Sequence, residues 1–181
     1  MSRVPLVSPA EAAGASRDLL AQVQSAFGAT PNMFRAVANS PAALRSMWSA
    51  FGALGGGVIP PALGEKIAVA VADRNRCEYC LAAHTALGRK AGASAEEMAE
   101  AQAGRAADPK TAAALRFALR LVDERGAVDR ADIAALHAVG FSDEEIVEML
   151  AHVALNLFTN YVNIAFDVPV DFPKVGLRAA A

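Results

Sequence analysis

Residues 65–84, EKIAVAVADRNRCEYCLAAH, contain both cysteines of the chain, one of its three histidines and a glutamate that opens an otherwise apolar run. If the chain is helical from about Cys77 onward, Cys77, Cys80 and His84 lie at positions i, i+3 and i+7, on one stripe of the helix. Glu65 is twelve residues before Cys77 and belongs to a preceding helix that can fold back against this one. We therefore expect two thiols, an imidazole and a carboxylate to face a common space.

The apolar run at residues 67–72 decides between helix and strand, because the letters IAVAVA suit a buried element of either kind. Helix is favoured, since alanine is a strong helix former and the segment from Ala62 to about Arg74 is longer than a typical strand. The segment is apolar on nearly all sides. We expect it to run through the middle of the protein.

The rest of the chain carries helix signals separated by short connections. An N-cap serine or aspartate opens most segments, a capping box opens two of them, and glycines supply the stops. The expected starts are Ser8-Pro9, Ser40-Pro41, Ser94 with Glu97, Asp108-Pro109, Asp129 and Ser142 with Glu145. These signals predict an all-α bundle of about seven or eight helices. We expect one domain over residues 1–181, with an extended arm at 1–7 and an extended tail at 169–181.

The composition limits the partners of the protein. The chain is 54% hydrophobic and 20% charged with a net charge of −2, so it has no electrostatic footprint for nucleic acid or an anionic membrane. No apolar run reaches the roughly 20 residues that span a bilayer, and the first residues lack a signal core. We expect a cytoplasmic protein with no nucleic-acid or membrane partner. The high apolar fraction favours a homo-oligomer.

The cysteine pair has several chemical interpretations. Two thiols on a helix can be small buried hydrophobes, but the Cys-x-x-Cys spacing favours a redox pair that closes a small disulfide. Cys77 is the candidate nucleophile if a helix N-terminus and the nearby Arg74 and Arg76 lower its thiol pKa. Cys80 is the candidate if the neighbouring His84 acts as its base. The residues alone leave this choice open. Zinc held by Cys77, Cys80, His84 and Glu65 is the main rival, although three of these ligands crowd onto two turns of one helix.

The pattern Glu-x11-Cys-x2-Cys-x3-His resembles the core of the AhpD-like alkylhydroperoxidase branch of the carboxymuconolactone decarboxylase superfamily. The similarity is strongest over residues 60–92, where Asn75, Tyr79 and Ala83 also fit. It extends more weakly to Asn156, Asn160, Tyr161, Asn163 and the closing DFP at 171–173. The decarboxylases that name the superfamily generally lack the cysteine pair. Its presence here argues against lactone decarboxylation.

The resemblance implies an AhpD-like all-α fold, a trimer or hexamer, and a cysteine-based peroxidase without cofactor or resident metal. In that mechanism His84 deprotonates Cys80, the peroxidatic thiol, and Glu65 completes the proton relay. Cys80 becomes a sulfenic acid and condenses with Cys77 to form the disulfide. An external dithiol, protein or small molecule, then reduces the pair. The implied substrates are hydrogen peroxide and small organic hydroperoxides.

One residue departs from the family pattern, because Tyr79 stands where the best-studied members have a second histidine. A tyrosine hydroxyl is a weaker base that can still hold a water or donate a hydrogen bond, so we expect a supporting role. A general thiol-disulfide oxidoreductase and a non-catalytic zinc-binding or assembly protein are the alternative functions.

Three further groups of polar residues have simpler interpretations. We interpret His152 as a packed, hydrogen-bonded core residue and His137 as a C-terminal helix residue placed favourably against the helix dipole. Asn156, Asn160 and Asn163 lie on an apolar segment, and we assign them to subunit contacts in preference to the pocket. Trp48 and Phe51 are expected in the core, at the edge of a pocket.

Overall fold

The helix α4 (Pro61–Arg74) lies at the centre of the protein, and four other helices pack against it. In this computed structural model, which describes residues 2–179, every residue from 67 to 72 is buried. The helices that contact α4 are α5 (Glu78–Lys90), α6 (Ala95–Gln102), α7 (Pro109–Asp123) and α9 (Asp143–Ala165). The choice of helix over strand for this run is confirmed.

The described residues form nine α-helices and no strand, which confirms the all-α class. The remaining helices are α1 (Gly14–Phe27), α2 (Asn32–Val37), α3 (Pro41–Gly55) and α8 (Arg130–Ala138). The expected number of seven or eight was too low. The shortest helix, α2, has six residues, which is less than two helical turns.

Most of the helix ends follow from the capping residues in the sequence. Ser40 and Asp108 each accept a backbone N–H in the first turn, before a proline at the start of the helix. Ser94 with Glu97 and Ser142 with Glu145 form the two capping boxes that the sequence predicts. Gly28 ends α1 in the left-handed conformation, at φ 74°.

The N-terminal signal at Ser8-Pro9 gives a different structure from the one expected. The carbonyl of Ser8 accepts N–H groups from Glu11 and Ala12, which closes a single turn. The chain then passes through a left-handed Gly14, at φ 52°, and α1 begins there. The predicted helix start was therefore several residues too early, because Ser8-Pro9 begins an isolated turn and not the helix.

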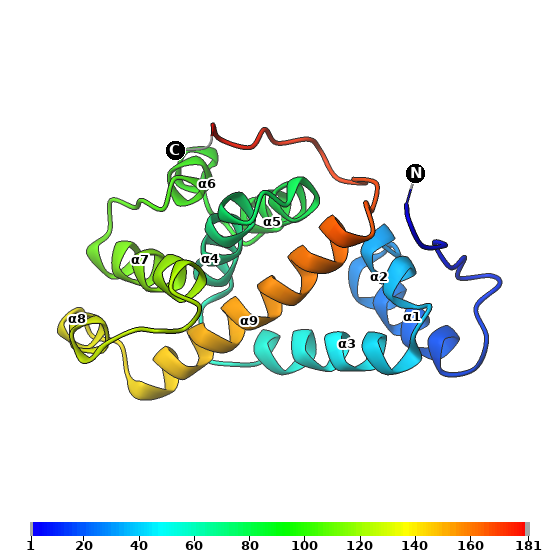
Figure 1. Cartoon of the computed structure of the whole chain (residues 1–181), viewed down its shortest axis with the longest axis horizontal. Helices are drawn as coiled ribbons and strands as arrows, with labels where there is room; N and C mark the ends of the chain where they lie inside the picture. Colours follow the sequence, from blue (N-terminus) through cyan, green and yellow to red (C-terminus); the bar gives the residue numbers. More distant parts are fainter. Residues whose placement is uncertain (1, 180–181) are drawn as a thin grey trace.

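The long helix α9 crosses the molecule diagonally, between α4 and α5 on one side and α3 on the other (Figure 1). After α9 the chain runs past α5 toward α6 (Figure 1), and Phe172 in this C-terminal segment packs against Tyr79 at the start of α5. Within the described residues this segment contains no helix or strand from 169 to 179. The outermost ends of the expected arm and tail, residues 1, 180 and 181, lie outside the described part.

None of the helices that the structure describes combines the length and the apolar character needed to cross a membrane.

Candidate functional site

The cysteine pair lies at the junction between α4 and α5. Arg76 adopts a left-handed conformation, at φ 61°, and the N–H of Cys77 donates to Ala72 O at 2.9 Å. Cys77 is the N-cap of α5, and its Sγ accepts the N–H of Cys80 at 3.2 Å. The sulfur of Cys77 therefore takes the capping position at the start of α5.

Cys77 and Cys80 are joined in a disulfide, with their Cα atoms 5.4 Å apart. Only 1% of Cys77 and 2% of Cys80 is exposed, so both sulfurs are buried. The nearby guanidinium groups bond elsewhere, Arg74 to Asp123 and Arg76 to Arg178 O. The disulfide is therefore screened from bulk water.

His84 lies one turn beyond Cys80, and its Nδ1 is 2.7 Å from Oε2 of Glu65 on α4. Both side chains are mostly buried, at 13% and 23% exposed. The two helices approach closely because Gly88 faces α4: a Cβ at this position would lie 3.3 Å from Glu65 Cβ. The structure thus brings Glu65, Cys77, Cys80 and His84 together, as the spacing predicts.

A carboxylate at Nδ1 fixes the proton on that nitrogen and leaves Nε2 as the basic atom of a neutral ring. A carboxylate beside the ring also stabilises the imidazolium that forms when the ring takes up a proton. The Glu65–His84 pair can therefore accept a proton from a neighbouring thiol and return it.

Asn163 on α9 completes the surroundings of Cys80. Its Nδ2 donates to Cys80 Sγ at 3.2 Å, and the residue is 4% exposed. Donation to sulfur stabilises a thiolate charge. Asn156 and Asn160 are also buried, and Asn160 accepts from Asn75 at 2.9 Å. The assignment of these three asparagines to subunit contacts was wrong, because they face the interior of the chain.

Tyr79, at the start of α5, contacts α2 and the C-terminal segment. Its hydroxyl accepts the N–H of Met33 at 3.2 Å, and its ring packs edge-on against Phe172 at a centroid distance of 5.7 Å. Burial raises the pKa of Tyr79 above its usual range, and the carboxylate of Asp171 raises it further. Tyr79 therefore stays neutral and joins α5 to α2 and the C-terminal segment.

Two cavities meet at His84. The first, here called the Cys80 pocket, has about 40 Å³ and an almost wholly apolar lining that includes Cys80, Phe34, Phe51 and Phe172. The second, here called the His152 cavity, has about 160 Å³. Its polar lining comes from Glu65, His84, His152, Asn156 and Thr159. Phe51, His84 and Thr159 line both, so His84 lies between the apolar Cys80 pocket and a cavity with a mixed polar and apolar lining.

His152 differs from the expected core residue. Its ring lines the second cavity, and its Nε2 is buried without a hydrogen-bond partner among the described residues. The closest acid, Glu148, is 3.8 Å away and uses both carboxylate oxygens on the N–H groups of Val58 and Ile59. Sequence reasoning missed this residue, because only the fold brings α9 beside Glu65 and His84. Its position four residues before Asn156 was the available signal.

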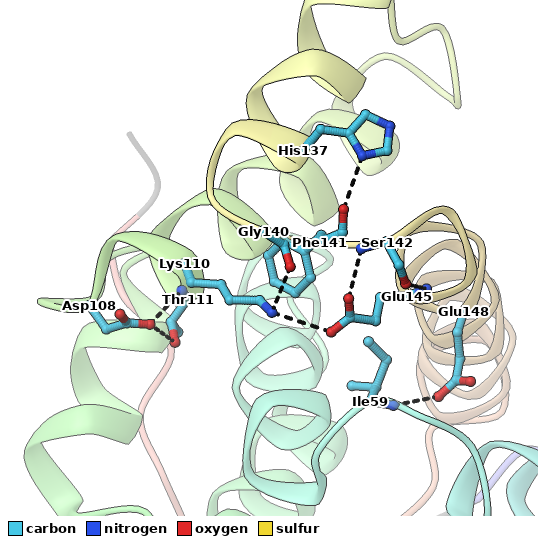
Figure 2. Close-up of polar contacts among 10 residues, drawn as sticks. All are labelled: Ile59, Asp108, Lys110, Thr111, His137, Gly140, Phe141, Ser142, Glu145 and Glu148. Carbon is cyan, nitrogen blue, oxygen red and sulfur yellow. Dashed lines mark hydrogen bonds and ion pairs between the residues drawn. The ribbon is translucent and has the colours of Figure 1, made fainter.

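The N-terminal end of α9 is fixed by polar contacts away from the cysteines (Figure 2). Glu148 reaches the loop before α4 through Ile59, and Lys110 bridges Gly140 O and Glu145 (Figure 2). His137 lies at the end of α8, where Nδ1 is 3.0 Å from Phe141 O (Figure 2). His137 therefore has a structural position, as its place in the sequence predicts.

The described residues contain no group of three or more His, Cys, Asp or Glu side chains arranged to hold a metal ion. Thiolates are the zinc ligands that the sequence offers, and here the two sulfurs are bonded to each other.

Comparisons with known proteins find the same family that the cysteine motif resembles. Residues 41–124 match the carboxymuconolactone decarboxylase family. A search of curated proteins gave no significant match. Among solved structures, a peroxidase-related protein with an alkylhydroperoxidase AhpD core from Ralstonia eutropha JMP134 is 28% identical and has a TM-score of 0.84. The similarity covers 94% of this chain and 92% of that one.

Two more distant structures share the fold. A peroxidase-related protein from Silicibacter sp. TM1040 is 23% identical with a TM-score of 0.80, over 93% of this chain and 91% of that one. A variant of the debrominase Bmp8 in complex with 2,3,4-tribromopyrrole is 20% identical with a TM-score of 0.79, over 94% of both chains. Together with the motif at Glu65, Cys77, Cys80 and His84, the family match and the similarity to the AhpD-core protein support a relation of this chain to the superfamily of AhpD-like proteins and carboxymuconolactone decarboxylases.

Proposed function

We propose that the protein is a cysteine-based peroxidase that reduces hydrogen peroxide or small organic hydroperoxides. One observation carries the proposal: the Glu65–His84 pair, joined at 2.7 Å, shares a pocket lining with the redox-active sulfur of Cys80. A buried thiol next to an imidazole that a carboxylate orients is the arrangement that activates a nucleophile.

In the first step Cys80 is the attacking thiol and His84 takes its proton. The thiolate attacks a peroxide oxygen, an S–O bond forms, the O–O bond breaks, and the proton passes to the leaving oxygen as water or alcohol. Cys80 is oxidised to the sulfenic acid and the peroxide is reduced. The thiol of Cys77 then attacks the sulfenic sulfur, which forms the disulfide and releases one water.

The size of the Cys80 pocket supports a small substrate. Its volume of about 40 Å³ exceeds the roughly 10–15 Å³ that a single water needs, so it admits a molecule of a few heavy atoms. Phenylalanine side chains dominate its walls. Hydrogen peroxide and short-chain hydroperoxides fit these dimensions, and bulky hydroperoxides do not.

We propose that an external dithiol regenerates the enzyme at Cys77. A separate hollow of about 360 Å³ is lined by Cys77, Arg76, Glu78 and Asp167. A thiolate of the reductant attacks the sulfur of Cys77, and Cys80 leaves as the thiolate. The second thiol of the reductant then displaces Cys77 and becomes a disulfide itself. The burial of both sulfurs disfavours a general oxidoreductase that acts on folded protein disulfides.

We also propose that the chain forms a homo-oligomer, a trimer or a hexamer. One face of α9 presents a row of exposed large apolar side chains at helical spacing: Val147, Leu150, Phe158, Tyr161 and Ile164. Here this row is called the α9 stripe. A contiguous apolar stripe of this kind is typical of a surface that another chain covers.

Peroxide consumption with dithiothreitol as reductant tests the function. The wild-type protein should consume hydrogen peroxide catalytically, and Cys80→Ser should abolish this activity. Cys77→Ser should permit a single turnover that leaves a sulfenic acid on Cys80, which a dimedone adduct reports. The reverse behaviour of the two variants would exchange their roles.

The rival activities are measured with the same preparation. Insulin reduction without peroxide consumption would favour a general thiol-disulfide oxidoreductase. Stoichiometric zinc with thiols inert to alkylation would favour a metal-binding protein. Because a debrominase shares this fold, a brominated pyrrole is included as a substrate, and activity with it alone would contradict the proposal.

A further inference from the structure

Four buried side-chain atoms lack a hydrogen-bond partner among the described residues, and all four belong to α9. They are His152 Nε2, Asn156 Oδ1, Asn160 Nδ2 and Asn163 Oδ1. The spacing of 4, 4 and 3 residues places them in one row on the inner face of the helix. The row begins at the His152 cavity and ends at Asn163, whose amide contacts the sulfur of Cys80.

Buried polar atoms of this kind are normally satisfied by bound water or by a ligand. His152 and Asn156 line the His152 cavity, whereas Asn163 lines the Cys80 pocket, whose walls are otherwise almost wholly apolar. Near Cys80, water and protons therefore have a favourable environment along α9 and the His152 cavity, and an unfavourable one in the Cys80 pocket.

The proposed reaction needs such a route during disulfide reduction. The dithiol attacks as a thiolate and leaves its protons in the bulk solvent, so negative charge arrives at two sulfurs that are almost completely buried. An unpaired charge in such a place is costly, and each released cysteine thiolate must take up a proton. Peroxide reduction needs no proton from solvent, because the proton of the Cys80 thiol moves within the site to the leaving oxygen.

The His152 cavity has the features of an entrance for these protons. Its rim includes the exposed residues Gly55 and Pro61, and its interior reaches Glu65 and His84. Gly64 leaves room for the imidazole of His152, since a Cβ there would lie 3.4 Å from Cε1 of the ring. The titratable groups that face His152 are Glu148 on its own helix, Glu65 on α4 and His84 on α5.

We propose that the His152 cavity is the proton entrance of the site, and that His152 relays protons from solvent to the Glu65–His84 pair. This inference rests on the proposed function. His152 acts here as a positioning residue, because it reaches the reacting sulfur only through Glu65 and His84. Burial lowers the pKa of His152, so at neutral pH the ring is uncharged and free to accept a proton and pass it on.

Measurement of the two half-reactions separately tests the inference. His152→Gln keeps a hydrogen-bonding side chain that cannot titrate. We expect it to slow disulfide reduction by dithiothreitol by about 10²-fold, the lower end of the usual effect of proton transfer catalysis, and to slow oxidation by hydrogen peroxide much less. Added imidazole should restore the reduction rate of His152→Ala. His137→Gln is the matched control, and it should react like the wild type.

Asn156→Leu provides a second test should the histidine variants fail to fold. Leucine has a similar volume and removes an unsatisfied amide oxygen, so thermal stability should stay equal or rise while reduction slows. A reduction rate unchanged by His152→Gln or by Asn156→Leu would overturn the inference, and so would equal slowing of both half-reactions. If the reduced wild-type protein fails to react with hydrogen peroxide, the proposed function itself fails.

Discussion

The carboxylate of Glu65 holds Nδ1 of His84 at 2.7 Å and thereby determines which ring nitrogen remains basic. We predict that Glu65→Gln lowers the kcat/KM for hydrogen peroxide by about 10²-fold, because a neutral amide cannot stabilise the imidazolium. Steady-state peroxide consumption measures the change. Glu100→Gln, which removes an exposed carboxylate paired with Arg105, is the control. Equal rates for Glu65→Gln and the wild type would remove Glu65 from the relay.

The buried imidazole of His152 also makes a prediction about stability. Its pKa in the folded protein lies below the ordinary value of 6.5, so the unfolded chain takes up a proton here at a pH where the folded protein does not. This contribution to stability is complete above pH 6.5 and is lost as the pH falls toward the folded-state pKa. The melting temperature should therefore fall between pH 7 and pH 5, and His152→Gln should flatten this fall.

The carboxylates of Glu145 and Glu148, on the same helix as His152, do not account for the fall in melting temperature between pH 7 and pH 5. The pKa values of Glu148 and Glu145 are lowered from 4.5, chiefly by backbone N–H groups, so they act at lower pH. Parallel melting curves for the wild type and His152→Gln between pH 7 and pH 5 would show that His152 is not the group responsible.

At the residue scale the sequence grouped four candidate residues that the structure brings together, but it did not place Asn163 and His152 beside them. Cys77, Cys80 and His84 lie on neighbouring turns of one helix, so local periodicity is enough to group them. The contact of Asn163 with Cys80 joins residues 83 positions apart, and the place of His152 depends equally on how α9 packs. Local periodicity contains no information about such contacts.

At the element scale, the close approach of α4 and α5 sets the distance between Glu65 and His84. Gly88 permits this approach, since a Cβ there would meet Met98 Cε at 2.4 Å and Glu65 Cβ at 3.3 Å. We predict that Gly88→Ala lowers peroxide turnover several-fold, because the helices must shift apart, and that it loses most of the usual stability gain of about 1 kcal/mol.

Gly52 in the interior of α3 is the matched control for Gly88, because a Cβ at Gly52 meets nothing within 4 Å. Gly52→Ala should raise stability by roughly 0.8–1 kcal/mol and leave turnover unchanged. Thermal unfolding and peroxide assays on both variants provide the comparison. Equal gains in stability with equal turnover would show that Gly88 does not control the spacing of α4 and α5.

The sequence predicted the helices better than it predicted their number and first boundary. Capping boxes at Ser94 and Ser142 and the left-handed Gly28 are local features whose chemistry is nearly independent of the fold. The predicted helix start at Ser8 was wrong because a single turn satisfies the same start signal. The choice between a turn and a helix depends on how the N-terminal arm packs. Tertiary contacts decided this case.

At the scale of the whole molecule, the α9 stripe remains uncovered in a single chain. Tyr161 is 60% exposed and Leu150 is 49% exposed. We predict that the protein sediments as a homo-oligomer and that Leu150→Glu with Tyr161→Glu shifts it to the monomer, because buried charge opposes association. Arg116→Glu on α7 serves as the control. A monomeric wild-type protein at micromolar concentration would contradict this part of the account.

Thiol titration of the fully reduced protein with one equivalent of hydrogen peroxide tests the central claim most directly. The account predicts that both cysteine thiols disappear together, that the intact mass falls by two hydrogens, and that dithiothreitol restores both thiols. Two thiols that persist after exposure to peroxide, or a product oxidised at only one sulfur without a disulfide, would contradict it.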